Sequence, residues 1–402
     1  MPIGDIGAVI DTLIFDGVRG RPGGLVRVAN DVYAVVYTGP TSDGLVATFT
    51  IDAAGGIGAA VIDTLTFETV NCLDPAIIQV SGETYAVVWS TDPIGIVATL
   101  TIDSAGNIGA AVVDTLQFEA STCIGPKIIL VSGSIYAIAY EGGVGPRGQL
   151  VTVDIAANGQ IAAAVTDTLA FETTQGEAPH IVNVTGTMYA IACMGGGSSR
   201  LKLITVDIQN NGNIAAAVTA TVTFTPTLVN CGPIVKVVNG VFLVAYTEAT
   251  TLKGSIASFT VSDAGAIGAS FLDSLEFDGV QGRDAEIVAV AGGVYAIAYE
   301  GVDDDGFLKT ARVDSTGAIG AVISTLEFDV GDSNFVYIIG VPGSDEIFAI
   351  AYADSLDRGT IKTCSVALQR EGYLWIEGAD MHHFDATNIE RLSQHEGKQR
   401  EF

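Results

Sequence analysis

The sequence contains few basic residues. Its 402 residues include 18 lysines and arginines against 46 aspartates and glutamates, a formal net charge of −28. A negative field of that size repels phosphate, so nucleic acid and anionic membrane surfaces are excluded as partners. Histidine is rarer still, and three of the four histidines follow Arg370. The main body of the chain has no recognisable Ser-His-Asp or Cys-His arrangement, so we expect no catalytic residues and favour a non-enzyme, with an enzyme left open.

Long apolar runs and paired cysteines are also missing. Although 49% of the residues are hydrophobic, no apolar run approaches the roughly 18–20 residues of a membrane-spanning helix. Residues 1–15 lack the basic and apolar regions of a signal peptide, so we expect neither secretion signal nor membrane insertion and leave the compartment open. The five cysteines are an odd number without C-x2-C spacing. A fully paired disulfide framework is therefore excluded, and a cysteine metal site is disfavoured.

One phrase recurs seven times along the chain. Its copies are VIDTLIF (9–15), VIDTLTF (61–67), VVDTLQF (112–118), VTDTLAF (165–171), VTATVTF (218–224), FLDSLEF (271–277) and VISTLEF (322–328). A second phrase, from YAVVY (33–37) to FAIAY (348–352), recurs with the same period. Such self-similarity indicates one repeat array with a tail rather than the two or three domains that the length alone would suggest.

Each repeat is predicted to form four short strands. In the second repeat these are Ala76–Val80, Tyr85–Trp89, Val97–Ile102 and Ile108–Phe118. The strands are rich in β-branched and aromatic residues, and Gly, Asn, Asp and Ser mark the turns between them. Because the strands are apolar on both faces, both sides of each sheet should be buried. Sheets of this kind, packed against their own copies, form the blades of an all-β propeller.

The ends of the array predict a closed ring. The chain begins with a fourth strand, Ile6–Phe15, and the seventh repeat stops after its third strand, Thr360–Ala367. The N-terminal strand would therefore complete the last blade and leave no open sheet edge. We expect a seven-bladed propeller over residues 1–372. Residues 373–402 should form a tail, with an added strand near Tyr373–Ile376 and a short helix at Asp385–Gln394, or a disordered segment.

The repeats and this closure resemble the seven-bladed β-propeller superfold over roughly residues 1–372. The signatures of WD40, kelch and YWTD propellers are absent from the sequence, and the turn at 102–108 is only loosely similar to those of Asp-box and NHL propellers. The resemblance implies a fold and no activity. Binding is expected on the face that carries the longer, more variable loops, which follow the second and fourth strands.

Two sets of recurring residues are interpreted as structural. Small residues enter the innermost strands, and we align them as Gly20, Cys72, Cys123, Gly176, Cys231, Gly282 and Ser333. They are expected to fill a tight inner corner. Acids recur within and just after the seven-residue phrase: Asp11, Asp63, Asp114, Asp167 and Asp273, then Asp16, Glu68, Glu119, Glu172, Asp278 and Asp329. A catalytic pair is normally unique, so acids that recur in most repeats are interpreted as structural. The first set should accept hydrogen bonds from turns, and the second should lie hydrated at the rim of the ring.

Other positions are candidate ligand-binding residues. One register of the innermost strands reads Arg27, Gln79, Leu130, Asn183, Lys236, Ala289 and Gly340. Its cations and amides could hold an anion, and side chains reaching into channel water would explain them equally well. His180, Arg21 and Arg283 are added because they lie at the start of innermost strands. Trp89 is added because aromatics ending the second strand stack on sugars in lectin-type propellers, although packing between blades is favoured for these rings.

No cofactor is predicted, with calcium and another metal as weaker alternatives. Asp303 and Asp305, with Glu300 nearby, could supply carboxylate oxygens, but they lack the alternating spacing of a calcium loop. In the tail, His382 and His383 with Asp380 and Asp385 could also bind a metal.

The leading functional hypothesis is a non-enzymatic binding or scaffold propeller. It would display its variable loops to a protein or a glycan, as part of a surface layer, a virion or another multi-subunit assembly. A lectin with sugar sites between the blades and a lactonase-like or glycosidase-like hydrolase at the channel mouth are the alternatives.

Overall fold

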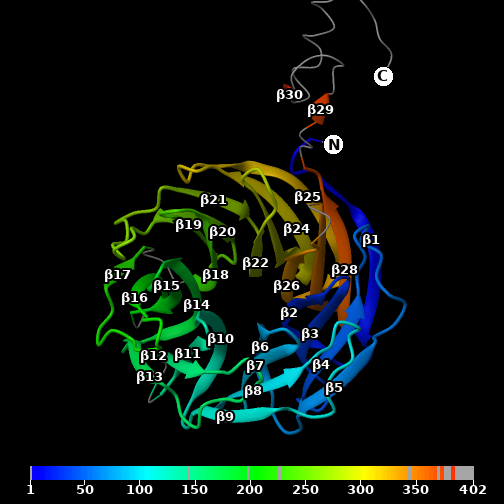
Figure 1. The fold of residues 1–402 in the computed structure, drawn as a ribbon. Helices are drawn as coiled ribbons and strands as arrows, with labels where there is room; N and C mark the ends of the chain where they lie inside the picture. The colour runs from blue at the N-terminus through cyan, green and yellow to red at the C-terminus, as the bar shows by residue number, and fades with distance from the viewer. Residues whose placement is uncertain are drawn as a thin grey trace, which may run out of the picture.

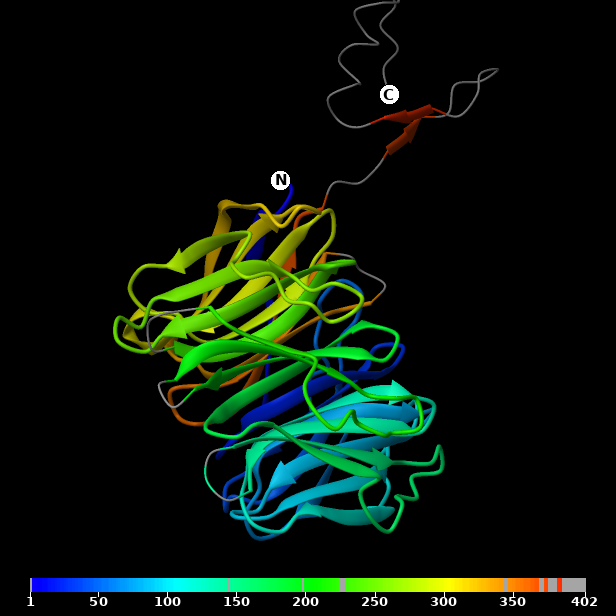
Figure 2. The ribbon, with the colours of Figure 1, turned by 90° about the vertical axis from the view of Figure 1, so that its left-hand side faces the viewer.

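The chain folds into a ring of seven four-stranded antiparallel sheets (Figure 1). The computed structural model describes residues 2–143, 145, 147–196, 199–224, 229–342 and 346–368, and the backbone of 372–374 and 382–384. Figure 2 shows the ring from the side, where each sheet is twisted. The prediction of a seven-bladed, all-β propeller is therefore confirmed.

Blades are numbered in chain order, and the innermost strand of each comes first in the sequence. Blade 1 contains β2 (Arg21–Ala29), β3 (Val32–Thr38), β4 (Gly44–Thr50) and β5 (Asp63–Glu68). Blade 2 contains β6 (Leu73–Ser81), β7 (Thr84–Ser90), β8 (Gly95–Thr101) and β9 (Asp114–Glu119). Blade 3 contains β10 (Cys123–Ser132), β11 (Ile135–Gly142), β12 (Arg147–Asp154) and β13 (Asp167–Glu172). Blade 4 contains β14 (Gly176–Thr185), β15 (Met188–Gly195), β16 (Arg200–Asp207) and β17 (Ala220–Thr223).

The remaining blades follow the same order. Blade 5 contains β18 (Val229–Val238), β19 (Val241–Glu248), β20 (Gly254–Thr260) and β21 (Asp273–Asp278). Blade 6 contains β22 (Arg283–Ala289), β23 (Val294–Glu300), β24 (Asp305–Val313) and β25 (Ile319–Asp332), with the 3₁₀ turn η1 (Val302–Asp304) before β24. Blade 7 contains β26 (Asn334–Gly340), β27 (Ile347–Ala353), β28 (Gly359–Val366) and the N-terminal strand β1 (Ile6–Asp16).

The ring closes through β1, as predicted. This strand pairs antiparallel with β28 from Ile6 opposite Val366 to Asp16 opposite Gly359, and the two lie side by side in Figure 1. Phe15 and Leu13 on β1 join the apolar cluster between blades 7 and 1. Closure thus joins the first and last strands of the ring and buries the edge that β28 would otherwise expose.

A buried hydroxyl connects each blade to the next. A Thr or Ser on the third strand of every blade donates to the carbonyl oxygen of a glycine that precedes the fourth strand of the following blade, at 2.5 to 2.7 Å. The seven pairs are Thr48–Gly106, Thr99–Gly159, Thr152–Gly212, Thr205–Gly265, Ser258–Gly317, Thr310–Gly4 and Thr363–Gly55. All seven glycines have φ between +82° and +92°, where a side chain would be strained. These hydroxyls were not among the residues predicted from the sequence to be structural.

A carboxylate forms a second connection at five of the seven blade junctions. An aspartate on the outermost strand accepts a hydrogen bond of 2.8 to 2.9 Å from an isoleucine amide of the next blade. The pairs are Asp11–Ile57, Asp63–Ile108, Asp114–Ile161, Asp167–Ile214 and Asp273–Ile319. Ser324 Oγ replaces the carboxylate at a sixth junction and accepts from Ile6 N at 3.1 Å. The predicted structural role of this acid set is confirmed.

Ala220 occupies the equivalent position at the junction of blades 4 and 5, where its methyl group cannot accept a hydrogen bond. We expect Ala220→Asp to stabilise the fold by about 1 kcal/mol, because its carboxylate would reach the Ile267 amide as Asp167 reaches that of Ile214. Urea unfolding measures the change. Ala217→Asp, an exposed position on the same segment, controls for added charge, and equal midpoints for the two variants would contradict the expected bond.

Aromatic rings fill the space between blades, as predicted. The phenylalanine of one blade meets the ring at the end of the next blade's second strand edge to face, with centroids 5.0 to 5.3 Å apart. The pairs are Phe15–Tyr37, Phe67–Trp89, Phe118–Tyr140, Phe277–Tyr299 and Phe328–Tyr352. These tyrosines and Trp89 are at most 2% exposed, so their faces are not presented to a sugar.

The acids that follow the phenylalanines have partners in the neighbouring blade rather than only solvating a rim. Tyr299 Oη and Lys309 Nζ both donate to Asp278 Oδ2, at 2.7 and 2.9 Å. Tyr352 and Lys362 bind Asp329 in the same way. These carboxylates are therefore structural as well, although their role differs from the predicted one.

Two further expectations need correction or lie outside the described residues. The fourth strand of blade 2 begins at Asp114 rather than at Ile108. Ile108 forms only an isolated bridge with Ile102, because the amide of Ile108 donates to Asp63 of blade 1.

In the tail, β29 (Gly372–Leu374) pairs with β30 (His382–Phe384). The helix expected at Asp385–Gln394 and the side chains of the tail metal candidates lie outside the described residues. Within the described ranges, no helix is long and apolar enough to cross a membrane.

Candidate binding site at the channel mouth

Every innermost strand carries a β-bulge near its first residues, on the face with the variable loops. The pairing with the second strand shifts at 22/24, 73/76, 124/127, 177/180, 231/234, 283/286 and 334/337. A bulge bends the strand and redirects its side chains. The seven bulges together surround one mouth of the central channel.

Four of these bulges contain a non-glycine residue in the left-handed region. Asp74, Ala178, Asp284 and Phe335 have φ between +46° and +57°. Such a conformation costs free energy and persists only where the surrounding structure imposes it, and it is common at functional sites. The mouth is therefore a first candidate for function, on grounds independent of its charge.

A cavity of about 420 Å³ occupies this mouth, and all seven blades contribute to its lining. Of the described residues around it, five are acids: Asp74, Glu141, Glu177, Asp284 and Glu286. The basic side chains of the lining are Lys127 and His180. The mouth is therefore predominantly acidic.

Lys127 is the central cation of the mouth. Its Nζ lies 3.0 Å from Tyr337 Oη and 5.4 Å from the centroid of the same ring. Burial opposes the charge of Lys127, but the adjacent Tyr337 and Glu286 raise its pKa above the usual value. Lys127 therefore stays protonated and offsets part of the acidic charge around it.

The acids are not fully compensated. Burial raises the pKa of Glu286 to about 7, with Lys127 opposing the shift and Asp284 adding to it. Burial, assisted by Glu177, also raises the pKa of Glu141 to about 7. Burial and the charge of Lys127 lower the pKa of His180 to about 3, so this imidazole is neutral. At neutral pH the described lining of the mouth therefore carries a net negative charge.

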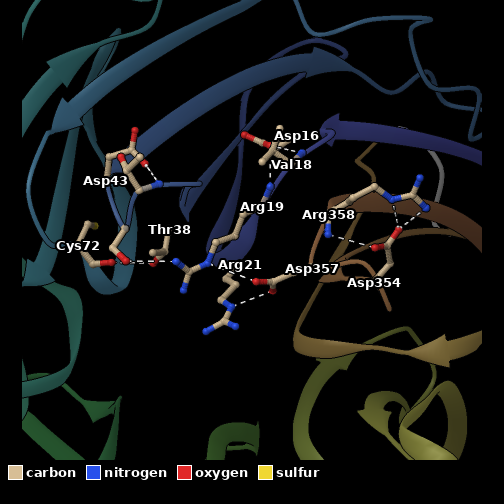
Figure 3. A network of polar contacts seen from close by, with 12 residues as sticks. Asp16, Val18, Arg19, Arg21, Thr38, Asp43, Cys72, Asp354, Asp357 and Arg358 are labelled. Atoms are coloured by element: carbon tan, nitrogen blue, oxygen red, sulfur yellow. Dashed lines mark hydrogen bonds and ion pairs between the residues drawn. The ribbon is translucent and has the colours of Figure 1, made fainter.

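A smaller cavity of about 240 Å³ adjoins the mouth and shares Pro22, Asp74 and Phe335 with it. Arg19 and Arg21 contribute to its lining. Figure 3 shows both arginines turned toward Asp357, with Nε–Oδ distances of 3.3 Å for Arg19 and 2.8 Å for Arg21. The guanidinium carbon of Arg21 lies 5.2 Å from the ring centroid of Phe335. A basic subsite thus borders the acidic mouth.

Apolar side chains stand at or beside the loop tips on the same face. Val18, Val70, Val280, Val330 and Leu356 are 63 to 82% exposed. The four valines belong to the junctions from blades 5 and 6 round to blades 1 and 2, and Leu356 lies in the β27–β28 loop of blade 7. Together they form a crescent on one side of the mouth.

Of the predicted ligand-binding residues, His180 lines the mouth and Arg21 lines the smaller adjoining cavity. The register candidates lie toward the other end of their strands, where their side chains bind nearby backbone carbonyls at 2.6 to 3.0 Å. The pairs are Arg27–Asn30, Gln79–Gly82, Asn183–Gly186 and Lys236–Val184. Arg283 pairs with Glu300 at 3.2 Å, and Trp89 is buried against Phe67.

The alignment of Cys231 with the small corner residues is wrong. Val229 occupies that corner in blade 5, because its amide donates to Ser199 O as the Cys72 amide donates to Ser42 O. Cys231 lies two residues further on, at the bulge, and lines the mouth. Burial raises its pKa well above the usual value, so this thiol is not an activated nucleophile.

The weak calcium candidates lie in and beside η1. Asp303 has φ of +60° within the turn, and Asp305 begins β24. Across the part of the chain that the structure describes, no group of three or more His, Cys, Asp or Glu is arranged to hold a metal ion.

Comparison with known proteins supports the fold. No protein-family model matches the sequence, and no curated protein sequence matches it. Among solved structures, the periplasmic gluconolactonase PpgL of Pseudomonas aeruginosa superposes with a TM-score of 0.57 at 15% identity, covering 75% of this chain and 84% of that one. Sqt1 of Saccharomyces cerevisiae superposes with a TM-score of 0.50 at 11% identity, covering 90% of this chain and all of that one. Likenesses at this identity show a common fold alone.

Proposed function

We propose that this chain is a binding propeller that docks a protein partner on the variable-loop face and receives a cationic side chain in the channel mouth. The observation that carries the proposal is the excess of carboxylates around one half-buried lysine, Lys127. A Lys or Arg side chain entering the cavity would pair with Glu286 and Glu141, which are half-buried, so that charge pairing is stronger than on an open surface.

The apolar crescent supports a protein partner rather than a free small cation. Exposed Val18, Val70, Val280 and Val330 offer contact area beside the mouth, and apolar area around a polar anchor is typical of protein interfaces. A glycan partner has less support, because the aromatic rings at the blade junctions are buried.

A model peptide tests the cation site. We expect N-acetyl-Gly-Gly-Lys-amide to bind the wild-type protein about tenfold more tightly at pH 8 than at pH 6, because Glu286 and Glu141 ionise around pH 7. The norleucine analogue, which lacks the charge, should bind weakly at both values. Chemical-shift titration measures affinities in this weak range.

The variant Glu286→Gln tests whether Glu286 binds the ammonium group of the lysine peptide. This variant should weaken binding of the lysine peptide at pH 8 by about tenfold, whereas Glu83→Gln, at an exposed turn on the opposite face, should leave it unchanged. Because ionised Glu286 is disfavoured by burial, its replacement is not expected to destabilise the fold at pH 8. Equal affinity for the lysine and norleucine peptides would contradict the proposal.

A lactone or ester hydrolase is the second candidate. The observation that favours it is the pKa of about 7 of Glu286, which suits a general base at neutral pH, next to the hydrogen-bonded pair of Lys127 and Tyr337. Glucono-δ-lactone is a direct probe, because one structural neighbour is a gluconolactonase. Hydrolysis above background that Glu286→Gln abolishes would support this candidate, and a rate equal to the background would eliminate it for this substrate.

A further inference from the structure

We infer that the pocket lined by Arg19 and Arg21 is a carboxylate subsite, and that the ligand of the channel mouth is the C-terminal Lys or Arg residue of a peptide. This inference rests on the proposed function, because the acidic mouth would hold the cationic side chain of the same residue.

The arginine pocket leaves N–H groups of Arg21 directed away from the acid with which it pairs. Two guanidinium groups share one carboxylate, that of Asp357. Arg21 meets Asp357 through Nε, and Figure 3 shows its two terminal nitrogens pointing away from that carboxylate. A guanidinium in this state can still offer a pair of parallel N–H groups to a second planar anion.

Arg21 is held in place for this role. Its side chain is fixed at Nε by Asp357, and its guanidinium lies against the ring of Phe335. Phe335 itself is at the bulge of β26 with φ of +57°. A cation that is stacked and hydrogen-bonded loses little further conformational freedom when it binds an anion, so the subsite is preorganised.

The two cavities are adjacent on the scale of one amino acid. Both are lined by Asp74 and Phe335. Phe335, against which Arg21 stacks, and Tyr337, to which Lys127 donates, are two residues apart across the bulge of β26, so their Cα atoms are separated by at most about 7 Å. The α-carboxylate and the ammonium of an extended lysine are about 7 Å apart. One C-terminal residue can therefore reach both subsites.

The charge balance favours a carboxylate over a phosphate. Arg19 and Arg21 are balanced by Asp357 and by Asp74, which also lines the pocket, so the outward-facing N–H groups of Arg21 suit a planar anion of a single charge. A dianionic phosphate would meet these acids and the five carboxylates of the mouth, where repulsion costs affinity.

Two peptides that differ only at the C-terminus test the inference. At pH 8 and low salt, we expect N-acetyl-Gly-Gly-Lys with a free carboxylate to bind about tenfold more tightly than its C-terminal amide, the gain of one bidentate charge-assisted contact. Arg21→Gln should remove this preference, because the acid then binds no more tightly than the amide. Arg358→Gln is the matched control, because Arg358 is also paired with a neighbouring acid, Asp354, but lines neither cavity.

The outcomes separate the two proposals. Equal binding of acid and amide to the wild type, or a preference that survives Arg21→Gln, overturns the carboxylate subsite even where the amide still binds and responds to Glu286→Gln. Failure of both peptides to bind overturns the proposed function together with the subsite. Should Arg21→Gln fail to fold, Arg21→Lys keeps the charge without the planar fork and is expected to reduce the preference several-fold.

Discussion

A chain without residues 1–16 is expected to lose cooperative folding. Without β1, the edge of β28 is exposed over its whole length, and the apolar cluster between blades 7 and 1 loses Phe15 and Leu13. The deletion also removes Gly4, the acceptor for Thr310, and Asp11, the acceptor for Ile57. These losses together should exceed about 5 kcal/mol, which is comparable to the whole stability of many domains. Thermal unfolding followed by circular dichroism measures the effect.

A circular permutant separates ring closure from the mere loss of residues. Gly4 N and Asp5 O are hydrogen-bonded to Ala367 at 2.8 Å, so a short linker can join the end of β28 to the start of β1. A chain of residues 17–368, the linker and residues 2–16 should melt cooperatively near the wild-type temperature. A deletion variant as stable as the permutant would show that β1 does not hold the ring.

Lys127→Met should destabilise the protein in a pH-dependent way. The variant leaves Glu286 and the other acids of the mouth without their central cation, so the attraction that offsets the mutual repulsion of these half-buried carboxylates is lost. Because channel water screens part of this, we expect a loss of about 2–3 kcal/mol at pH 8. At pH 5 the loss should fall to about 1 kcal/mol, since Glu286 and Glu141, whose pKa values are about 7, are then protonated.

The direction of this pH dependence follows from the pKa values of Lys127 and Glu286 in the folded protein. A raised pKa of Lys127 means that its stabilising contribution is present throughout pH 5–8 and is lost only at alkaline pH. The raised pKa of Glu286 means that the folded state binds more protons than the unfolded state between about pH 4.5 and 7, so the stability contributed by this residue falls as the pH rises through that interval. Urea unfolding at both pH values measures the difference.

Two variants control this experiment. Lys253→Met breaks an ion pair with Glu276 whose side chains are 36 and 48% exposed, and such an exposed pair should contribute little to stability at either pH. The double variant Lys127→Met/Glu286→Gln should recover much of the stability at pH 8. A Lys127→Met loss that is equal at pH 5 and pH 8 would contradict the charge account.

The fold could be predicted because the same pattern of strands and turns recurs seven times in the sequence. The closing Phe15 and the truncated seventh repeat gave the ring closure, and the recurrence of Asp11 and its counterparts separated structural acids from a catalytic pair. Repetition also caused an error. Cys231 was matched to Cys72 by residue type, whereas the backbone hydrogen bonds place Val229 at that corner.

The site could be predicted only in part, because it consists of departures from the repeat. Lys127, Glu286 and Tyr337 stand at equivalent positions in blades 3, 6 and 7, but nothing resembling them recurs in the other blades except His180. The bulge before them shifts the alternation of side chains by one residue, so periodicity does not show which position faces the channel. The candidates predicted from the sequence stand in the diverse register three residues later, apart from His180 at the mouth and Arg21 in the adjoining cavity. The polar residues after Pro126 and Pro179 were the available signal.

The pairing of β1 with β28 also has a consequence for biosynthesis. The two strands are separated by about 340 residues, and translation at roughly 5–20 residues per second takes about 20–70 s to cover that distance. During this time β1 emerges first and waits with both edges unpaired, while later blades fold beside it. Its alternation of exposed and buried positions, with Asp11 and Thr12 on the strand, reduces the hazard of premature association that an apolar edge would carry. The last strand to be synthesised in the ring is thus the one that gives the first strand its partner.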